Sequence, residues 1–154
     1  MNMTDEERDY FDRWVRVEIY ARWIKSGVAP DASDVAQALN RDVAATEASF
    51  QRLAAAKVLT LAPVTGRLWM AYPFSAVPTP YRVRTTGRAY WANCAWDAFG
   101  IAAMIGQDAT TVAPCADCGE PIDLSIRSGA VAAETGFVHF VVPPRKFWDN
   151  VAFT

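Results

Sequence analysis

A cysteine and an aspartate stand three residues apart in the stretch WANCAWDAFG, residues 91–100. On a helix, residues at this spacing share one face, with Cβ atoms about 5–6 Å apart. A helix that begins near Trp91 would place Cys94 in its first turn, where the helix dipole favours a thiolate. Burial would raise the pKa of Asp97, so that its carboxyl group could hold and transfer a proton. The pattern indicates a soft nucleophile beside a proton carrier.

The alternative for this pair is structural. Free cysteine is often a small core residue, and an aspartate near a helix start often caps the helix or pairs locally. The spacing alone favours this structural alternative, while the aromatic neighbours could keep the pair dry enough for chemistry. We therefore expect a substrate pocket whose apolar wall includes Trp91, Trp96 and Phe99.

A second group of thiols lies in CADCGEP, where Cys115 and Cys118 form one Cys-x-x-Cys turn. One such pair supplies only two ligands, whereas structural zinc takes four. Cys94 and His139 could complete a metal site, and at least one of the two turn sulfurs is then expected to face Cys94. The turn could equally keep both sulfurs reduced and unligated. His139 lies in an alternating segment, FVHFVV, and is expected to be structural.

In the N-terminal half, the spacing of apolar residues and the helix-capping residues predict the secondary structure. Thr4 and Glu7 have capping-box spacing, and Gly27 ends the apolar helical stripe that follows. Residues 31–57 predict two short helices, and residues 58–74 predict two apolar strands around a turn. Three helices followed by a hairpin are typical of a winged helix.

In the C-terminal half, the spacing of apolar residues changes from mainly helical to mainly alternating, which is typical of strands. Pro78 and Pro80 predict a linker, residues 81–90 a strand pair, and residues 91–105 a helix that ends near Gly106. Short strands are expected at TTVAPC, PIDLSI and FVHFVV. The predicted fold is α+β, with a winged-helix-like lobe at 1–77 and a small mixed-sheet lobe, carrying the site helix, at 81–154.

Composition and charge narrow the functional classes. The chain has 154 residues and a net charge of −2, and residues 1–60 hold ten acidic and eight basic residues, so a nucleic-acid partner is disfavoured. No apolar run reaches the roughly 18 residues of a membrane span, and no signal peptide is recognised. Three cysteines cannot all pair, which fits a reducing cytoplasm. Oligomeric state is not indicated.

These motifs together resemble the alkylmercury (organomercurial) lyase family over nearly the whole chain. The resemblance rests on YWANCAWDAFGIAAMIG, on APCADCGEPIDLSI and on VHFVVPPRKFWDN. It implies that Cys94 and Asp97 are the family's catalytic Cys-x-x-Asp, and that Cys115 matches a cysteine regarded as structural. It also implies a winged-helix-like lobe followed by the family's mixed-sheet catalytic lobe.

The resemblance further implies a reaction. Cys94 binds the mercury of an organomercurial, a second thiol adds, and Asp97 protonates the carbon, so that a hydrocarbon leaves and Hg(II) stays bound until cytosolic thiols extract it. No cofactor is required. The family's second catalytic cysteine is expected shortly after the segment matching WDNVAFT, near the last residue, Thr154. Either the lobe is shortened there, or the protein works without that thiol, with Cys118 as a substitute.

Three functional hypotheses follow from these patterns. The first is a carbon–mercury lyase acting on a small organometallic substrate. The second is a diverged family member that binds a soft metal or serves a biosynthetic step. The third is a winged-helix regulator that senses metal through Cys94, Cys115 and Cys118, and the charge balance of its helices disfavours it.

Overall fold

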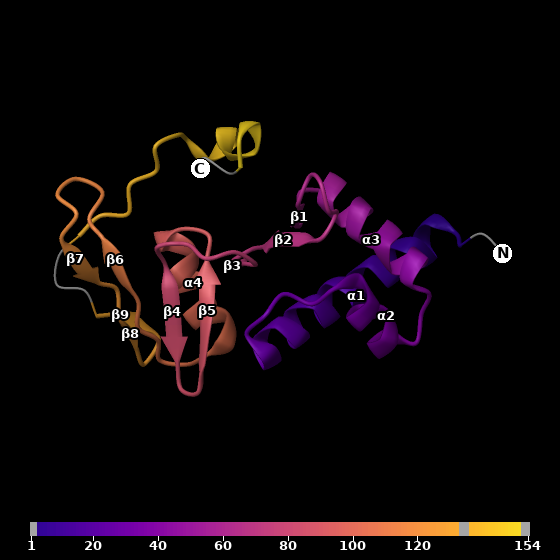
Figure 1. Cartoon of the computed structure of the whole chain (residues 1–154), viewed down its shortest axis with the longest axis horizontal. Coiled ribbons are helices and arrows are strands. Elements are labelled where there is room, and N and C mark those ends of the chain that lie inside the picture. The colour runs from indigo at the N-terminus through magenta and orange to yellow at the C-terminus, as the bar shows by residue number, and fades with distance from the viewer. Residues whose placement is uncertain (1–2, 133–135, 152–154) are drawn as a thin grey trace.

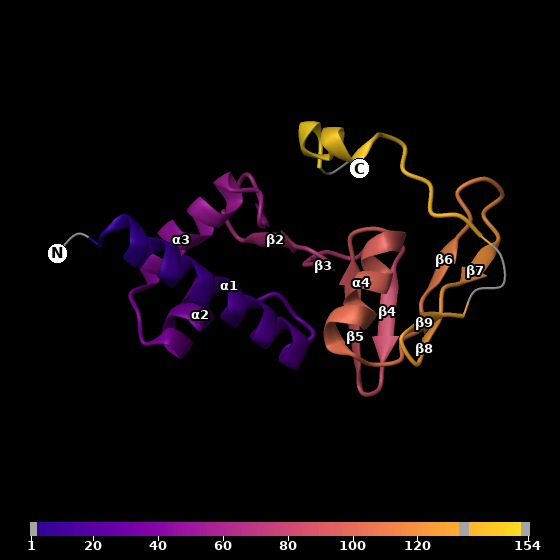
Figure 2. The same ribbon diagram turned by 180° about the vertical axis from the view of Figure 1, so that it is seen from behind.

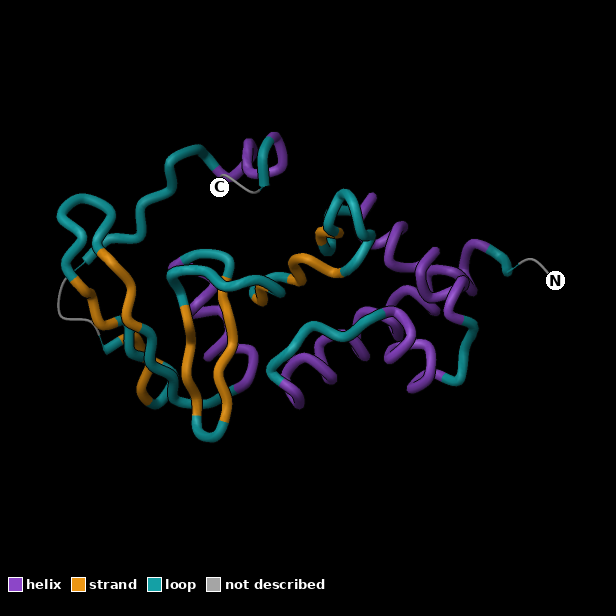
Figure 3. The backbone as a smooth tube through the Cα atoms, in the orientation of Figure 1, coloured by secondary structure: helices purple, strands orange, loops and turns teal. Residues whose placement is uncertain are grey.

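The structure is a computed structural model that describes residues 3–132 and 136–151. Figures 1 and 3 show helices at the N-terminal end and short strands after them. The helices are α1 (Asp5–Ser26), α2 (Ala32–Leu39), α3 (Val43–Ala55), α4 (Ala95–Ile105) and the 3₁₀ helix η1 (Pro144–Asp149). The strands are β1 (Thr60–Leu61), β2 (Leu68–Ala71), β3 (Phe74–Ser75), β4 (Arg82–Thr85), β5 (Arg88–Ala92), β6 (Val112–Pro114), β7 (Pro121–Asp123), β8 (Ile126–Arg127) and β9 (Ala130–Val131). The predicted α+β class is confirmed.

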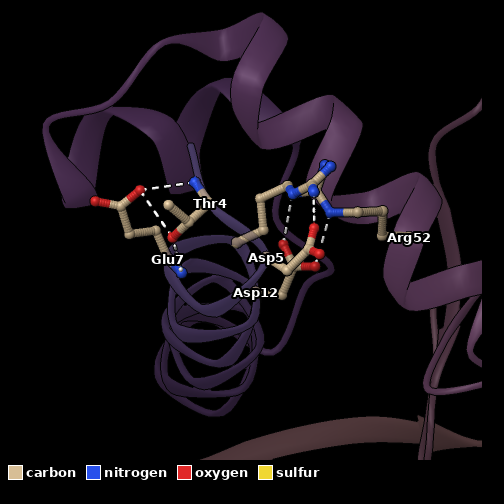
Figure 4. Close-up of polar contacts among 6 residues, drawn as sticks. Thr4, Asp5, Glu7, Asp12 and Arg52 are labelled. Atoms are coloured by element: carbon tan, nitrogen blue, oxygen red, sulfur yellow. Dashed lines mark hydrogen bonds and ion pairs between the residues drawn. The ribbon is translucent and has the colours of Figure 1, made fainter. Parts of the chain in front are cut away.

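Helix α1 begins and ends where the sequence predicts. The Thr4 side chain accepts the N–H of Glu7, and the Glu7 carboxylate accepts the N–H of Thr4, so two otherwise free amides are satisfied (Figure 4). Gly27 follows the helix with φ 80°, a left-handed conformation that glycine adopts without strain. The apolar stripe buries Phe11, Val15, Ile19 and Trp23.

Both helices predicted over residues 31–57 are present as α2 and α3, and the hairpin β1–β2 follows them. Three helices and a hairpin therefore occur in the predicted order. The assignment of this lobe to the winged-helix class stays a prediction. The proposed domain boundary between 77 and 81 stays a prediction as well.

A polar cluster fastens α1 to α3. The Asp12 carboxylate accepts hydrogen bonds from Nε and one terminal nitrogen of Arg52, at 2.8 and 2.6 Å (Figure 4). It also accepts a hydrogen bond from the Ser49 hydroxyl. Ser49 is fully buried, so Asp12 supplies the acceptor that its hydroxyl would otherwise lack.

We expect Asp12→Ala to lower the free energy of unfolding by about 1–3 kcal/mol, because it leaves the buried Ser49 hydroxyl unsatisfied and Arg52 unpaired. Asp5→Ala is the matched control. It removes a carboxylate that pairs with Arg8 at the exposed start of α1, and should cost on the order of 0.5 kcal/mol. Urea denaturation of both variants measures the difference. Equal losses would mean that the Asp12 cluster is no stronger than a surface ion pair.

One five-stranded sheet extends from the helical lobe into the C-terminal half. Its strand order is β1-β2-β3-β5-β4, and the pairings between its strands are antiparallel. Strand β3 lies between β2 and β5, so it connects the hairpin that follows α3 with the predicted strand pair β4–β5. The sheet thus crosses the predicted linker region.

Phe74 is the centre of the shared core. It is fully buried in β3, stacks on Trp23 of α1 at 5.5 Å between ring centroids, and meets the edge of Tyr90 of β5 at 5.5 Å. The Tyr90 hydroxyl also donates to the carbonyl of Ile24 at 2.8 Å. The end of α1 is therefore fixed to the sheet by both apolar packing and a hydrogen bond.

Helix α4 packs on β4 and β5, and two small hairpins extend the strand region beyond them (Figures 1 and 2). Arg84 of β4 exchanges backbone hydrogen bonds with Thr110, and Ala109 does so with Ile126. The pairs β6–β7 and β8–β9 are antiparallel. PIDLSI, predicted as one strand, is divided between β7 and β8.

The strand predicted over residues 137–142 is wrong. This segment has no regular structure, and Phe137 is fully exposed. A strand needs a neighbour that satisfies its N–H and C=O groups, and among the described residues none pairs with this segment. His139 is accordingly exposed and lies in a loop. The chain then turns back toward the helical lobe, where η1 lies (Figure 1).

Candidate active site

Cys94 and Asp97 lie at the start of α4, but the helix begins later than predicted. Trp91 and Ala92 belong to β5, because they pair with Ser75 and Phe74 of β3. Cys94 is the N-cap, with extended backbone angles (φ −147°, ψ 179°), and the helix proper starts at Ala95. The prediction that the helix begins near Trp91 is therefore wrong, because the last two residues of β5 come before it.

The cysteine caps the helix with its sulfur. The N–H of Asp97 donates to Cys94 Sγ at 3.4 Å, in the manner of a serine or aspartate N-cap. Both side chains are half-buried, so they share a partly dry environment on one face of α4. The juxtaposition predicted from the three-residue spacing is present, and the residue that would capture a metal is also the helix cap.

Burial governs the protonation of this pair. It raises the pKa of the Cys94 thiol, and the charge of Asp97 adds to that increase, while the N–H groups of Asp97 and Trp96 oppose it. The expectation that the helix start favours a thiolate is therefore wrong in its net direction. Burial also raises the pKa of Asp97, against hydrogen bonds from Asn93 and Cys94. Both groups keep their protons to a higher pH than usual.

The turn between β2 and β3 faces α4 across the site. A side chain at Gly100, one turn after Asp97, would meet Pro73 at 3.2 Å, so the helix and the turn approach closely here. The Asn93 amide donates to the carbonyls of Pro73 and Phe74 at 3.2 and 3.3 Å. Sequence reasoning missed Asn93, although a polar residue beside Cys94 in an apolar stretch could have indicated it.

Two tyrosines from distant segments also belong to this region. The Tyr20 hydroxyl of α1 donates to the carbonyl of Tyr72 at 2.8 Å, and the Tyr72 hydroxyl lies 3.0 Å from Thr60 Oγ1. Burial raises the pKa of both phenols, and the nearby Asp97 contributes to the increase in each case. No spacing in the sequence could reveal them, because 52 residues separate the two tyrosines.

The C-terminal tail adds an aromatic residue to the same turn. Trp148 of η1 meets the Tyr72 ring edge-to-face, with centroids 5.6 Å apart, and the ammonium of Lys57 lies 5.7 Å from its ring. The tail therefore docks on the turn that faces Asp97. Sequence reasoning did not include Trp148 or Tyr72 among the aromatic residues near Asp97.

The three aromatics predicted as that wall lie in different surroundings. Trp96 is 62% exposed and does not bury the site. Trp91 is half-buried, with the guanidinium of Arg82 5.2 Å from its ring. Phe99 is half-buried and packs against the main core. Their roles in substrate binding stay predictions.

The metal ligands predicted from the sequence are Cys94, Asp97, Cys115 and Cys118. Among residues 3–132 and 136–151, no group of three or more His, Cys, Asp and Glu side chains could hold a metal ion. Cys115 is half-buried and Cys118 exposed, in the turn between β6 and β7. The β6–β7 hairpin lies at the end of the molecule opposite the N-terminal helices (Figures 1 and 2). In the described part of the chain, Cys94 and Asp97 therefore form no such group with the turn cysteines.

A large hollow also lies elsewhere. Its volume is about 840 Å³, and it is lined by residues of α1 and of the α2–α3 connection, including Tyr10 and Trp14. Neither Cys94 nor Asp97 lines it. In the described part of the chain, no helix is long and apolar enough to cross a membrane.

The raised pKa of Asp97 predicts a pH-dependent effect on stability. The folded chain binds this proton more tightly than the unfolded chain, so its stabilising effect is full below the unfolded pKa, about 3.9, and is lost as pH rises through the folded value. Asp97→Asn removes the buried charge. We expect the variant to melt at a higher temperature than the parent at about pH 7 and to lose this advantage near pH 3.5. Thermal denaturation at both pH values tests it, and a pH-independent difference would contradict it.

The fold and this pair define an α+β protein with a thiol and a carboxyl group at one helix start. A family model described as alkylmercury lyase matches residues 74–154. The alkylmercury lyase of Staphylococcus epidermidis is 30% identical over 93 residues, which cover 54% of this chain and 43% of that protein. That of Bacillus cereus is 31% identical over 80 residues, which cover 50% and 37%. The chain spans less than half the length of these relatives.

A solved structure supports the same relationship at the level of fold. The mercury-bound form of MerB2 aligns with a TM-score of 0.63 and 21% identity, over 79% of this chain and 57% of that one. Because the family model covers more than half of the sequence, this chain belongs to the alkylmercury lyase family.

Proposed function

We propose that this protein is a carbon–mercury lyase that cleaves organomercurials into a hydrocarbon and Hg(II). The proposal is supported by membership of the alkylmercury lyase family. The observation that carries it is the half-buried pair at the start of α4, in which Asp97 donates its N–H to Cys94 Sγ and the pKa of its carboxyl group is raised.

The reaction begins with ligand exchange. The Cys94 sulfur, soft and polarisable, displaces the ligand X from R–Hg–X, and the thiol proton passes to the Asp97 carboxylate. This step gives Cys94–S–Hg–R, neutral Asp97 and free X⁻. The raised pKa of Asp97 favours this transfer, because it makes the carboxylate a better proton acceptor. The raised pKa of the Cys94 thiol opposes it, so the bond from mercury to sulfur must form as the proton leaves.

The second step breaks the carbon–mercury bond. A thiolate from a small thiol adds to mercury and increases the electron density on carbon, and Asp97 then delivers its proton to that carbon. The products are R–H, Cys94–S–Hg–SR′ and the Asp97 carboxylate, so atoms and charge balance. Further small thiols extract Hg(II) and return a proton to Cys94. A reducing cytoplasm supplies such thiols, and no cofactor takes part.

The test is to incubate the protein with an arylmercurial and excess small thiol and to measure free arene. We expect arene release well above the rate with thiol alone. Capture of the arylmercurial without arene would favour the second candidate, a diverged family member that binds soft metal. If the protein neither captured the arylmercurial nor released arene, a function in mercury chemistry would be ruled out.

A further inference from the structure

Backbone hydrogen bonds define the turn of the β6–β7 hairpin, which carries Cys115 and Cys118. The N–H of Cys115 donates to the carbonyl of Glu120 at 2.7 Å, and the N–H of Gly119 donates to the carbonyl of Cys115 at 3.0 Å. Gly119 adopts φ 76°, which lets the chain reverse directly after Cys118. The backbone thus fixes the two cysteines across one tight turn.

The Cys-x-x-Cys spacing within this hydrogen-bonded turn brings the two cysteine side chains together. The backbone N–H groups of Cys118 and Asp117, and then the Cys118 side chain, lower the pKa of the Cys115 thiol. Donors that surround a sulfur in this way stabilise negative charge on it, as in anion-binding backbone nests. Cys118 is exposed and Cys115 half-buried, so a ligand can reach the pair from solvent.

The number of ligands selects the kind of metal. No third His, Cys, Asp or Glu joins the pair in the part of the chain that the structure describes. Zinc takes four ligands in structural sites, so this pair alone does not complete a zinc site. A soft cation such as Hg(II) is stable with two sulfur ligands arranged linearly, so it needs no third ligand from the protein.

We propose that Cys115 and Cys118 form a second mercury site, separate from Cys94 and Asp97, that takes Hg(II) from small thiols. The step is an exchange: Hg(SR)₂ and two protein thiols give Cys115–S–Hg–S–Cys118 and two molecules of RSH. Mercury stays Hg(II), and each protein proton leaves on a small thiol. A role in receiving the lyase product rests on the proposed function, whereas binding of inorganic Hg(II) does not.

The test uses inorganic Hg(II) in the presence of a small monothiol, with native mass spectrometry and the ultraviolet absorbance of mercury–thiolate bonds as readouts. Cys94→Ser isolates the turn, and we expect it to retain one Hg(II) per chain. Adding Cys118→Ser, and separately Cys115→Ser, leaves one turn thiol. Because two linked ligands gain about 10²–10⁴-fold over one, these double variants should lose mercury at monothiol concentrations at least 100-fold lower.

Three results would overturn the proposal. Cys94→Ser and the double variants could lose mercury at the same monothiol concentration. The mass could show Hg(II) bridging two chains. Zinc could compete equally for Cys94→Ser, which would indicate further ligands. None of these readouts requires carbon–mercury cleavage, so failure of this site and failure of the lyase activity are distinguishable.

Discussion

Asp97→Asn is expected still to capture an arylmercurial, with the Cys94 proton passing to water instead of residue 97, and to release almost no arene. The amide keeps the shape of the carboxyl group but cannot carry the thiol proton to carbon, and loss of a positioned general acid costs about 10²–10⁴-fold in rate. The cleanest background is Cys115→Ser with Cys118→Ser, in which the turn thiols cannot bind the substrate. Capture is counted by mass spectrometry, and arene by chromatography, in a single turnover.

Asp108→Asn is the matched control for this variant. Asp108 is a half-exposed aspartate that accepts the N–H of Ser128 and lies near Arg127, outside the site. It should release arene at the parent rate. Parental release by Asp97→Asn as well would remove the carboxylate from the mechanism.

Cys94→Ser is expected to abolish both capture and arene release in the same background. A hydroxyl is a hard, poorly polarisable ligand, so mercury has no partner at this position. The structure makes this substitution unusually clean, because Cys94 is an N-cap and serine is among the preferred N-cap residues. Helix α4 should therefore keep its start, and the melting temperature should not fall.

That stability measurement separates chemistry from folding. Cys94→Ala removes both the sulfur and the cap, and should lose about 0.5–2 kcal/mol in addition to capture. If Cys94→Ser still captured one arylmercury group per chain, the half-buried cysteine would be a packing residue, as its alternative interpretation holds.

The sequence predicted those parts of the fold that local signals determine. Thr4, Glu7 and Gly27 gave both ends of α1 because caps act within a few residues. The start of α4 was misplaced because Trp91 and Ala92 are taken by a partner strand, β3, that no local signal reveals. Residues 137–142 show the converse, since their alternation fits a strand but no described strand pairs with them.

The site divides in the same way. The proximity of Cys94 and Asp97 could be predicted because they are three residues apart at the start of one helix. Tyr20 and Tyr72 could not, because the path of the chain brings them together. The net protonation of Cys94 was also beyond the sequence, since burial outweighs the donors at the helix start, and burial is a property of the whole fold.

The shared sheet has a consequence for how this protein can be divided. The recognised family segment begins at residue 74, in the strand β3. Yet β3 hydrogen-bonds to β2 on one side, and Phe74 stacks on Trp23, so both partners precede that segment. The family match therefore begins inside the sheet, at a strand that is paired with the strand before it. A module excised at residue 74 would carry Cys94 and Asp97 without the helix α1 and the strand β2 that pack against β3, so the helical lobe is an integral part of the structure around this pair.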